Sequence, residues 1–101
     1  MNAKEEFMEH INDRVVKCAG IWLDRSYGKD VKPFNLCQQY SNEQYIAFIN
    51  SLDFKYDAGF GGHELYGTIW YEDGTWSERG EYDGSEWWEH HVCPEIPEGL
   101  K

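Results

Sequence analysis

A chain of 101 residues with no apolar run near the ~20 residues of a membrane span is expected to form one domain, 1–101, away from membranes. Its formal net charge of −10 lies almost wholly in the second half, because residues 1–50 carry six basic and seven acidic side chains and residues 51–101 carry three and twelve. Such a negative field repels nucleic acids and anionic membranes and attracts basic protein surfaces, although it also keeps an aromatic-rich chain soluble.

The beginning of the chain predicts a helix followed by a strand. Asn2 and Glu5 have the spacing of a capping box, and apolar residues then recur every four positions, which predicts a helix over residues 3–13. The run VVKCAGIWL at 15–23 is rich in β-branched and aromatic residues and predicts a buried strand. A continuation of the helix is the alternative, which Gly20 disfavours.

The middle of the chain predicts a short strand, a second helix and a glycine-rich loop. The strand is expected over residues 34–37. Ser41 and Gln44 repeat the capping-box spacing and precede apolar residues with helical periodicity, so a helix is expected over residues 42–52. The stretch DAGFGG at 57–62 is expected to form a loop, and it lacks the G-x-G-x-x-G spacing of a phosphate-binding turn.

The last third of the chain has the pattern of a three-stranded antiparallel meander over residues 64–92. Runs rich in Tyr, Trp, Ile and Thr are divided by two Asp-Gly turns, which begin at Asp73 and Asp83. Two prolines then end the sheet, because proline cannot donate to a β-ladder, and residues 93–101 are expected to form an extended tail. The predicted fold class is therefore α+β, with two helices packed on a mainly antiparallel sheet that ends in the meander.

Each Asp-Gly turn is compatible with two hairpin registers. At the first turn, a type I′ turn pairs Glu72 with Thr75, whereas a type I turn with a left-handed bulge pairs Tyr71 with Thr75. If both turns are of one kind, Trp76 faces an aromatic ring and a histidine, and Arg79 faces a tryptophan. The candidate neighbours are Tyr71 or Trp70 and His91 or His90 for Trp76, and Trp88 or Trp87 for Arg79. Arg79 is thus expected to make a cation–π contact and to meet nearby carboxylates, with a structural role favoured.

Two adjacent tryptophans in the last strand suggest an interaction surface. Trp87 and Trp88 point to opposite faces of a strand, so only one can enter a core beneath the helices. The other needs a cover, which is the tail, a second copy of the chain or a partner. The carboxylates of the meander are expected to form an acidic rim, namely Glu78, Glu81, Asp83, Glu86 and Glu89. The candidate binding residues are these five acids, Arg79, Trp70, Trp76, Trp87 and Trp88.

Catalytic and metal sites are less favoured interpretations of the same region. Glu78 and Glu89 lie opposite each other in the type I′ register and can act as an acid–base pair, but no nucleophile motif accompanies them. A zinc site would use His90, His91 and Cys93, with His63 or another cysteine. Consecutive histidines on a strand diverge, and Asp73 and Asp83 lack the D-x-D-x-D-G pattern of a calcium loop. No metal, cofactor or enzymatic activity is therefore expected.

The cysteines and the first residues of the chain bear on the compartment. Cys18, Cys37 and Cys93 are an odd number of cysteines without a C-x-x-C pair, so a disulfide framework is not expected. Residues 1–10 lack the basic and then apolar pattern of a secretory signal. The cytoplasm is therefore the expected compartment.

Residues 52–97, and most specifically the stretch GTIWYEDGTWSERGEYDGSEWWEHHVCPEIP, resemble a family of small uncharacterised acidic proteins encoded by tailed bacteriophages and prophages of enteric bacteria. The resemblance covers under half of the chain and transfers no catalytic residue. It implies a phage context and an intracellular life in the bacterial host.

Charge, aromatic residues and resemblance together favour a binding function. The expected partner is a host protein with a basic surface, plausibly a nucleic-acid-binding groove that the chain inhibits or modulates. The first alternative is a structural or accessory domain that forms a homodimer, and the second is a metal-dependent or hydrolytic enzyme.

Overall fold

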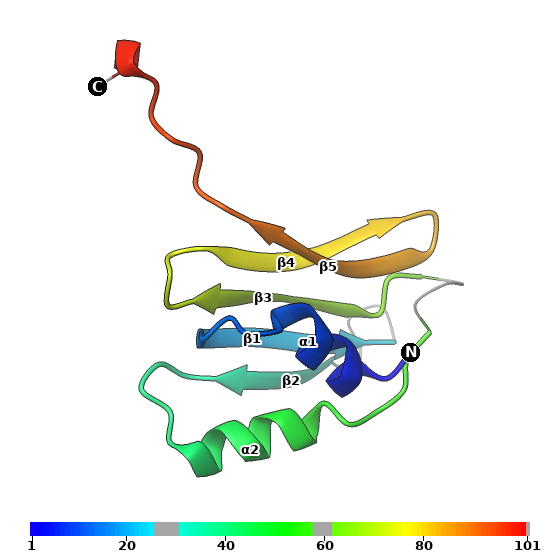
Figure 1. Ribbon diagram of the computed structural model, residues 1–101. Helices are drawn as coiled ribbons and strands as arrows, with labels where there is room; N and C mark the ends of the chain where they lie inside the picture. Colours follow the sequence, from blue (N-terminus) through cyan, green and yellow to red (C-terminus); the bar gives the residue numbers. More distant parts are fainter. Residues whose placement is uncertain (26–30, 58–61, 101) are drawn as a thin grey trace.

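The computed structural model of the protein describes residues 1–25, 31–57 and 62–100 (Figure 1). In chain order the elements are α1 (Ala3–Ile11), β1 (Val16–Asp24), β2 (Val31–Leu36), α2 (Asn42–Ser51), β3 (Leu65–Tyr71), β4 (Trp76–Tyr82), β5 (Ser85–His91) and the short 3-10 helix η1 (Glu98–Leu100). The strands form one sheet in the order β2-β1-β3-β4-β5, and every neighbouring pair is antiparallel. The predicted α+β class is confirmed, and β3, β4 and β5 form the meander. Most of the loop predicted over 57–62 lies outside the described residues.

Both helices begin at the caps that the sequence predicts. The Asn2 side chain accepts a hydrogen bond of 3.0 Å from the backbone N–H of Glu5. Ser41 and Gln44 form a reciprocal capping box at the start of α2. α1 ends at Ile11 instead of residue 13, because the next residue, Asn12, has a φ of 53° and leaves the right-handed helical region.

The run VVKCAGIWL forms the strand β1 and does not continue α1. β1 pairs with β2 on one side and with β3 on the other, and buried side chains alternate with more exposed ones along it. The pairing with β3 requires glycine at position 67, because a Cβ on Gly67 would lie 2.6 Å from the carbonyl oxygen of Gly20. The strand β2 begins at Val31, earlier than the strand predicted over 34–37.

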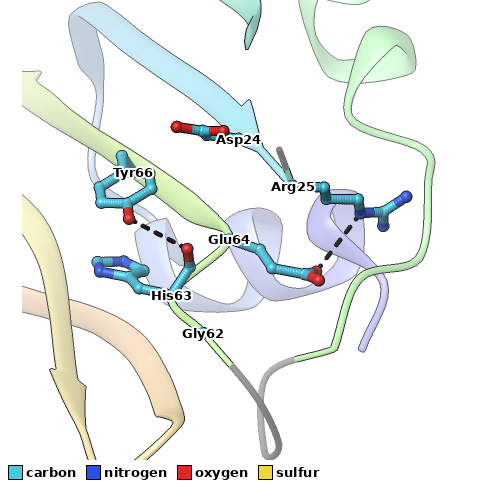
Figure 2. Close-up of a pocket in the computed structure, with 6 residues that line it drawn as sticks. All are labelled: Asp24, Arg25, Gly62, His63, Glu64 and Tyr66. Carbon is cyan, nitrogen blue, oxygen red and sulfur yellow. Dashed lines mark hydrogen bonds and ion pairs between the residues drawn. The ribbon is translucent and has the colours of Figure 1, made fainter. Parts of the chain in front are cut away.

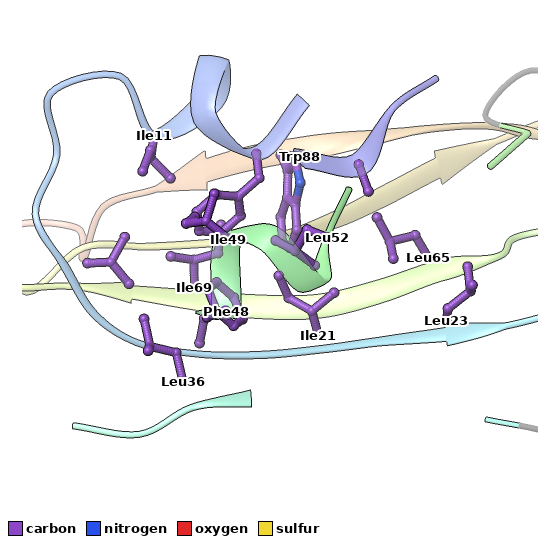
Figure 3. Packing of buried hydrophobic residues seen from close by; sticks show 14 of the residues in the cluster. Ile11, Ile21, Leu23, Leu36, Phe48, Ile49, Leu52, Leu65, Ile69 and Trp88 are labelled. Atoms are coloured by element: carbon purple, nitrogen blue, oxygen red, sulfur yellow. The ribbon is translucent and has the colours of Figure 1, made fainter. Parts of the chain in front are cut away.

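Both helices pack against one face of the sheet, which we call the core face (Figure 3). Phe7 of α1 meets Phe48 of α2 and Trp88 of β5 edge to face, with ring centroids 5.6 and 6.4 Å apart. Ile21 and Ile69 come from the two central strands and complete this core beneath the helices. The core therefore joins elements from both ends of the chain.

Residues 92–100 leave the sheet after β5 and project away from the body of the protein (Figure 1). All of them are exposed, including the apolar side chains of Val92, Ile96 and Leu100. Of this segment, which the sequence predicts to be extended from residue 93, only η1 has regular structure. In this structure the tail does not cover the tryptophans of the sheet.

Candidate functional site

The first Asp-Gly turn takes the bulged form. The backbone N–H of Tyr71 donates to the carbonyl oxygen of Thr75 at 3.0 Å, and Gly74 has the positive φ of 86° that this bulge requires. As a result Trp70 of β3 lies directly opposite Trp76 of β4.

The second Asp-Gly turn takes the type I′ form. Asp83 and Gly84 both have positive φ values, 51° and 86°, and Tyr82 pairs with Ser85. The two turns are therefore of different kinds, so the assumption of one common kind is wrong.

The predicted neighbours of Trp76 and Arg79 are nevertheless found. Trp76 lies between Trp70 on β3 and His91 on β5, and its ring stacks on the imidazole of His91 with centroids 5.7 Å apart. Arg79 lies opposite Trp88, with its guanidinium carbon 4.9 Å from the ring centroid. Trp70 is the neighbour expected from the bulged register, and His91 and Trp88 are the neighbours expected from the type I′ register. The mixture of turns therefore still gives Trp76 and Arg79 the kinds of neighbour that were predicted.

The face of the sheet away from the helices, which we call the outer face, is rich in aromatic residues. Its side chains alternate with those of the core face along β1, β3, β4 and β5. Four of the five tryptophans point to this side, namely Trp22, Trp70, Trp76 and Trp87. Trp22 and Trp70 are 41% and 46% exposed, and no described helix covers them. An uncovered face of this composition is a candidate binding surface.

The adjacent tryptophans Trp87 and Trp88 divide between the two faces as expected. Trp88 is only 7% exposed and lies in the core beneath α1, where it also stacks with His10 at 6.2 Å between centroids. Trp87 lies across β4 above Gly80, and its indole N–H donates to Glu89 at 2.8 Å. Trp87 is therefore the candidate for binding, and Trp88 is a core residue.

Aromatic rings on the outer face stack on one another across strands. Trp22 of β1 and Tyr66 of β3 are parallel within 6°, with centroids 5.6 Å apart. His63 also stacks on Tyr66, with centroids 3.9 Å apart. Stacking holds these side chains in one conformation, so little conformational entropy would be lost when a partner binds.

Glu78 and Glu89 face each other across β4 and β5 on the outer face. The imidazole Nε2 of His91 lies 3.2 Å from Glu78 Oε1 and 3.6 Å from Glu89 Oε2. All three side chains are partly exposed, and solvent weakens the coupling that an acid–base pair needs. The arrangement is better suited to attracting a cation than to proton transfer.

Arg79, Glu86 and Trp88, which the sequence places among the binding residues, are buried on the core face. The side chains of Arg79 and Glu86 are 2% and 0% exposed, and Nη2 of the arginine donates to Oε1 of the glutamate at 2.9 Å. The type I′ register directs these three residues toward α1, so Glu86 does not belong to the acidic rim. Glu81 and Asp83 are exposed at the second turn, as expected.

The buried Arg79 joins five segments of the chain. Its Nη2 also donates to Tyr56 Oη at 2.8 Å, its Nε donates to the carbonyl oxygen of Leu65 at 3.2 Å, and its Nη1 lies 3.1 Å from Glu6 Oε2. Both carboxylate oxygens of Glu86 accept backbone N–H groups of β3 and the residue before it, each at 2.9 Å. Every charge in this network has a partner inside the protein, which is the condition for burying ions.

The pKa values of this network reflect its pairing. Burial lowers the pKa of Arg79, but the Glu6 carboxylate, Tyr56 and Glu86 outweigh burial and hold the pKa above its ordinary value. Burial and the hydrogen bond to Glu6 raise the pKa of Tyr56 far above its ordinary range, against the opposing effect of Arg79. Arg79 and Tyr56 therefore keep their protons at all physiological pH values. The network stabilises the packing of the segments that it joins.

A second polar contact links α1 to the sheet. His10 Nε2 lies 2.7 Å from the hydroxyl of Ser77, and Tyr71 Oη lies 2.7 Å from the same hydroxyl. Ser77 and Tyr71 are fully buried, so this serine–histidine pair is closed to a substrate. Burial, followed by the charges of Arg14, His90 and Arg79, lowers the pKa of His10.

Within the described residues no group of three or more His, Cys, Asp or Glu is arranged to hold a metal ion. Of the residues considered for zinc, His90 contacts Thr75 Oγ1 at 2.9 Å, His63 contacts the carbonyl oxygen of Leu65 at 2.6 Å, and Cys93 is exposed in the tail. These histidines already have structural contacts within the sheet.

A small pocket of about 220 Å³ lies where β1 ends and β3 begins (Figure 2). Its lining residues are Asp24, Arg25, Gly62, His63, Glu64 and Tyr66. Arg25 and Glu64 form an ion pair at 3.5 Å, and the Tyr66 hydroxyl donates to the carbonyl oxygen of His63 at 3.0 Å. This volume lies below the ~300 Å³ of ordinary ligand pockets.

Sequence reasoning missed residues both inside and outside the meander. Trp22 and Tyr66 belong to the outer face, and alternation within β1 would have indicated the exposure of Trp22. Glu6 and Tyr56 reach Arg79 from distant segments, and no local pattern announces such a contact.

No described helix is both long enough and apolar enough to cross a membrane. Comparison of the chain with protein-family models, curated proteins and solved structures found no match.

Proposed function

We propose that this protein is a binding protein whose outer face docks on a partner protein with a basic surface. The observation that carries the proposal is the placement of four of the five tryptophans on a sheet face that no described helix covers. Tryptophan is the residue type most enriched among the anchors of protein interfaces. A purely structural role would not require this much aromatic surface in water.

Charge selects the kind of partner. Glu78 and Glu89 lie among the tryptophans, and Glu81 and Asp83 are exposed at the neighbouring turn. With a net charge of −10, the chain attracts cationic surfaces and speeds their encounter at low salt. The same charge opposes docking of two identical outer faces, so the homodimer is the second candidate.

The resemblance to phage and prophage proteins gives the proposal its finer form. The partner is then a host protein with a basic nucleic-acid-binding groove, in which carboxylates take the positions of phosphates and indole rings anchor the contact. Binding in such a groove would inhibit or modulate the host protein. This finer form depends on the resemblance as well as on the outer face.

The test is affinity capture from an enteric bacterial lysate with three forms of the protein. The first is unchanged, the second carries Trp22→Ser and Trp70→Ser on the outer face, and the third carries Met8→Ser and Ile46→Ser. The third is a matched control, because Met8 and Ile46 are exposed apolar residues of α1 and α2, away from the outer face.

We expect basic proteins to be captured by the first and third forms, to be lost from the second, and to be displaced by added double-stranded DNA. Capture that is equal for all three forms would refute binding through the outer face. Sizing chromatography tests the second candidate, the homodimer. If the unchanged protein is a dimer and the form with Trp22→Ser and Trp70→Ser is a monomer, the outer face binds a second copy of the chain and not another protein.

A further inference from the structure

The outer face is organised as three rows that run across the strands. The central row is polar and passes through all five strands, from Asn35 through Gly20, Thr68 and Glu78 to Glu89. On one side of it lies a row with Trp22, Tyr66 and Trp87, which we call the Trp22 row. On the other side Cys18, Trp70, Trp76 and His91 form the Trp70 row.

On β1 and β3 the side chains of the central row are small. Gly20 has no side chain and Thr68 has a short one, whereas both neighbouring rows carry indole rings. Trp22 stacks on Tyr66, and Trp76 stacks on His91, so the rings support one another within each row. Small residues therefore lie between supported rings on β1 and β3, and we call the central row the track.

The dimensions of this track suit a single chain. Rows on one face are two residues apart, about 7 Å, so the two aromatic rows are about 14 Å apart along the strands, and the thickness of the rings narrows the space between them. Four strand spacings of about 4.8 Å make the central row about 19 Å long, which an extended segment of about six residues spans. An α-helix with its side chains is about 10–12 Å wide, so it would rest on top of the rings and not lie between the two rows.

Charge gives the track a direction. Its β4–β5 end carries Glu78 and Glu89, opposed only by the single His91. Trp87 donates to Glu89 and thereby orients this carboxylate beside an indole ring. A guanidinium group fits this end, because it pairs with carboxylates and stacks on indole rings. Lys17 of β1 lines a hollow with Trp70, so the β4–β5 end is the one that attracts a cation.

We propose that the occupant of the outer face is an extended, arginine-rich segment of the partner, which lies across the strands on the central row with an arginine beside Glu78 and Glu89. This inference rests on the proposed function and narrows it from a basic surface to a basic linear segment. The aromatic rows contact the apolar parts of its side chains, and the carboxylates contact its guanidinium groups. A second copy of the chain does not qualify, because its three arginines, Arg14, Arg25 and the buried Arg79, are far apart in the sequence and form no arginine-rich segment.

The direct test uses a hexa-arginine peptide as the probe and NMR titration of the whole protein as the readout. We expect the largest shifts at the backbone amides of Gly20, Thr68, Glu78 and Glu89 and at the indole N–H groups of Trp76 and Trp87. A hexa-citrulline peptide of the same length and polarity but without charge is expected to bind at least tenfold more weakly.

Two charge-matched variants locate the binding. Thr68→Arg places a cation of the chain itself on the central row, directly opposite Glu78, and is expected to weaken hexa-arginine binding at least tenfold. Ile46→Arg adds the same charge on α2 and is expected to weaken binding less than twofold. A circular dichroism melt confirms that both variants are folded before the titration.

Equal weakening by Thr68→Arg and Ile46→Arg would show that the peptide binds only to net charge and would overturn the inference. Shifts confined to the acidic first turn of α1 would overturn it as well. If partner capture is lost with Trp22→Ser and Trp70→Ser but unchanged with Thr68→Arg, the proposed binding function stands, and the inference that a linear segment occupies the central row is wrong. If none of these variants alters partner capture, both proposals fail.

Discussion

The two faces of the sheet use the same residue types in opposite ways. On the core face, the guanidinium of Arg79 and the carboxylate of Glu86 pair at 2.9 Å beside Trp88, within the protein and away from water. On the outer face, Glu78 and Glu89 lie opposite each other beside exposed tryptophans. Side chains of neighbouring residues on a strand point to opposite faces, so one step along β4 separates an exposed acid from a buried cation. Position in the register, more than residue type, decides here which side chains are buried and which are exposed.

The largest expected effect follows from removing the buried cation. Arg79→Met leaves Glu86 and Glu6 without their partner, and breaking a buried ion pair in this way costs about 3–5 kcal/mol of the free energy of unfolding. Urea unfolding followed by circular dichroism measures this cost. Arg25→Met is the control, because Arg25 is half-exposed and its ion pair with Glu64 should contribute less than about 1 kcal/mol. Similar losses for the two variants would contradict the assigned burial.

The adjacent tryptophans provide the next comparison. Trp88→Ala removes a buried ring that contacts Phe7 and Arg79 and is expected to lower the free energy of unfolding by about 3 kcal/mol. Trp87→Ala removes a partly exposed ring and should cost about 1 kcal/mol or less. Urea unfolding of both variants measures the difference. If Trp87→Ala cost more than Trp88→Ala, Trp87 would be the buried ring, and the β4–β5 hairpin would have the bulged register.

A smaller effect is expected from pH through His10. Its folded pKa lies below the ordinary 6.5, because of burial and then the charges of Arg14, His90 and Arg79. As the pH falls below 6.5 the unfolded chain binds the proton first, so stability present above 6.5 is lost until the folded pKa is reached. Urea midpoints at several pH values between 7.5 and 5.5 should fall for the unchanged protein and fall less for His10→Gln. An identical decline in both would exclude His10 as a cause.

The smallest effect on stability is expected on the outer face. Trp22→Ser with Trp70→Ser should change the free energy of unfolding by about 1 kcal/mol or less, because both rings are largely in water. The same variant is expected to lose partner binding. A loss of several kcal/mol, seen in thermal or urea unfolding, would mean that these rings stabilise the fold. The core face and the outer face would then not differ in their contribution to stability.

Local patterns in the sequence predicted most of the fold. Capping residues placed both helix starts, and Asp-Gly pairs placed both hairpin turns. The ends of elements were less certain, because the positive φ of Asn12 that ends α1 follows from the path into β1. Of the candidate binding residues, Trp70, Trp76, Glu78 and Glu89 lie on the outer face, which the sequence left open, and their role in binding stays a prediction.

The sequence by itself determined the class of fold, the meander and the acidity of the second half of the chain, because these depend on local periodicity, turn chemistry and composition. Only the tertiary structure decided the kind of each turn, and with it the burial of Arg79, Glu86 and Trp88 and the exposure of Trp87. It also brought Glu6 and Tyr56 to Arg79, and Trp22 into the row with Tyr66. Those contacts join residues far apart in the chain, and a pattern within a short window carries no information about them.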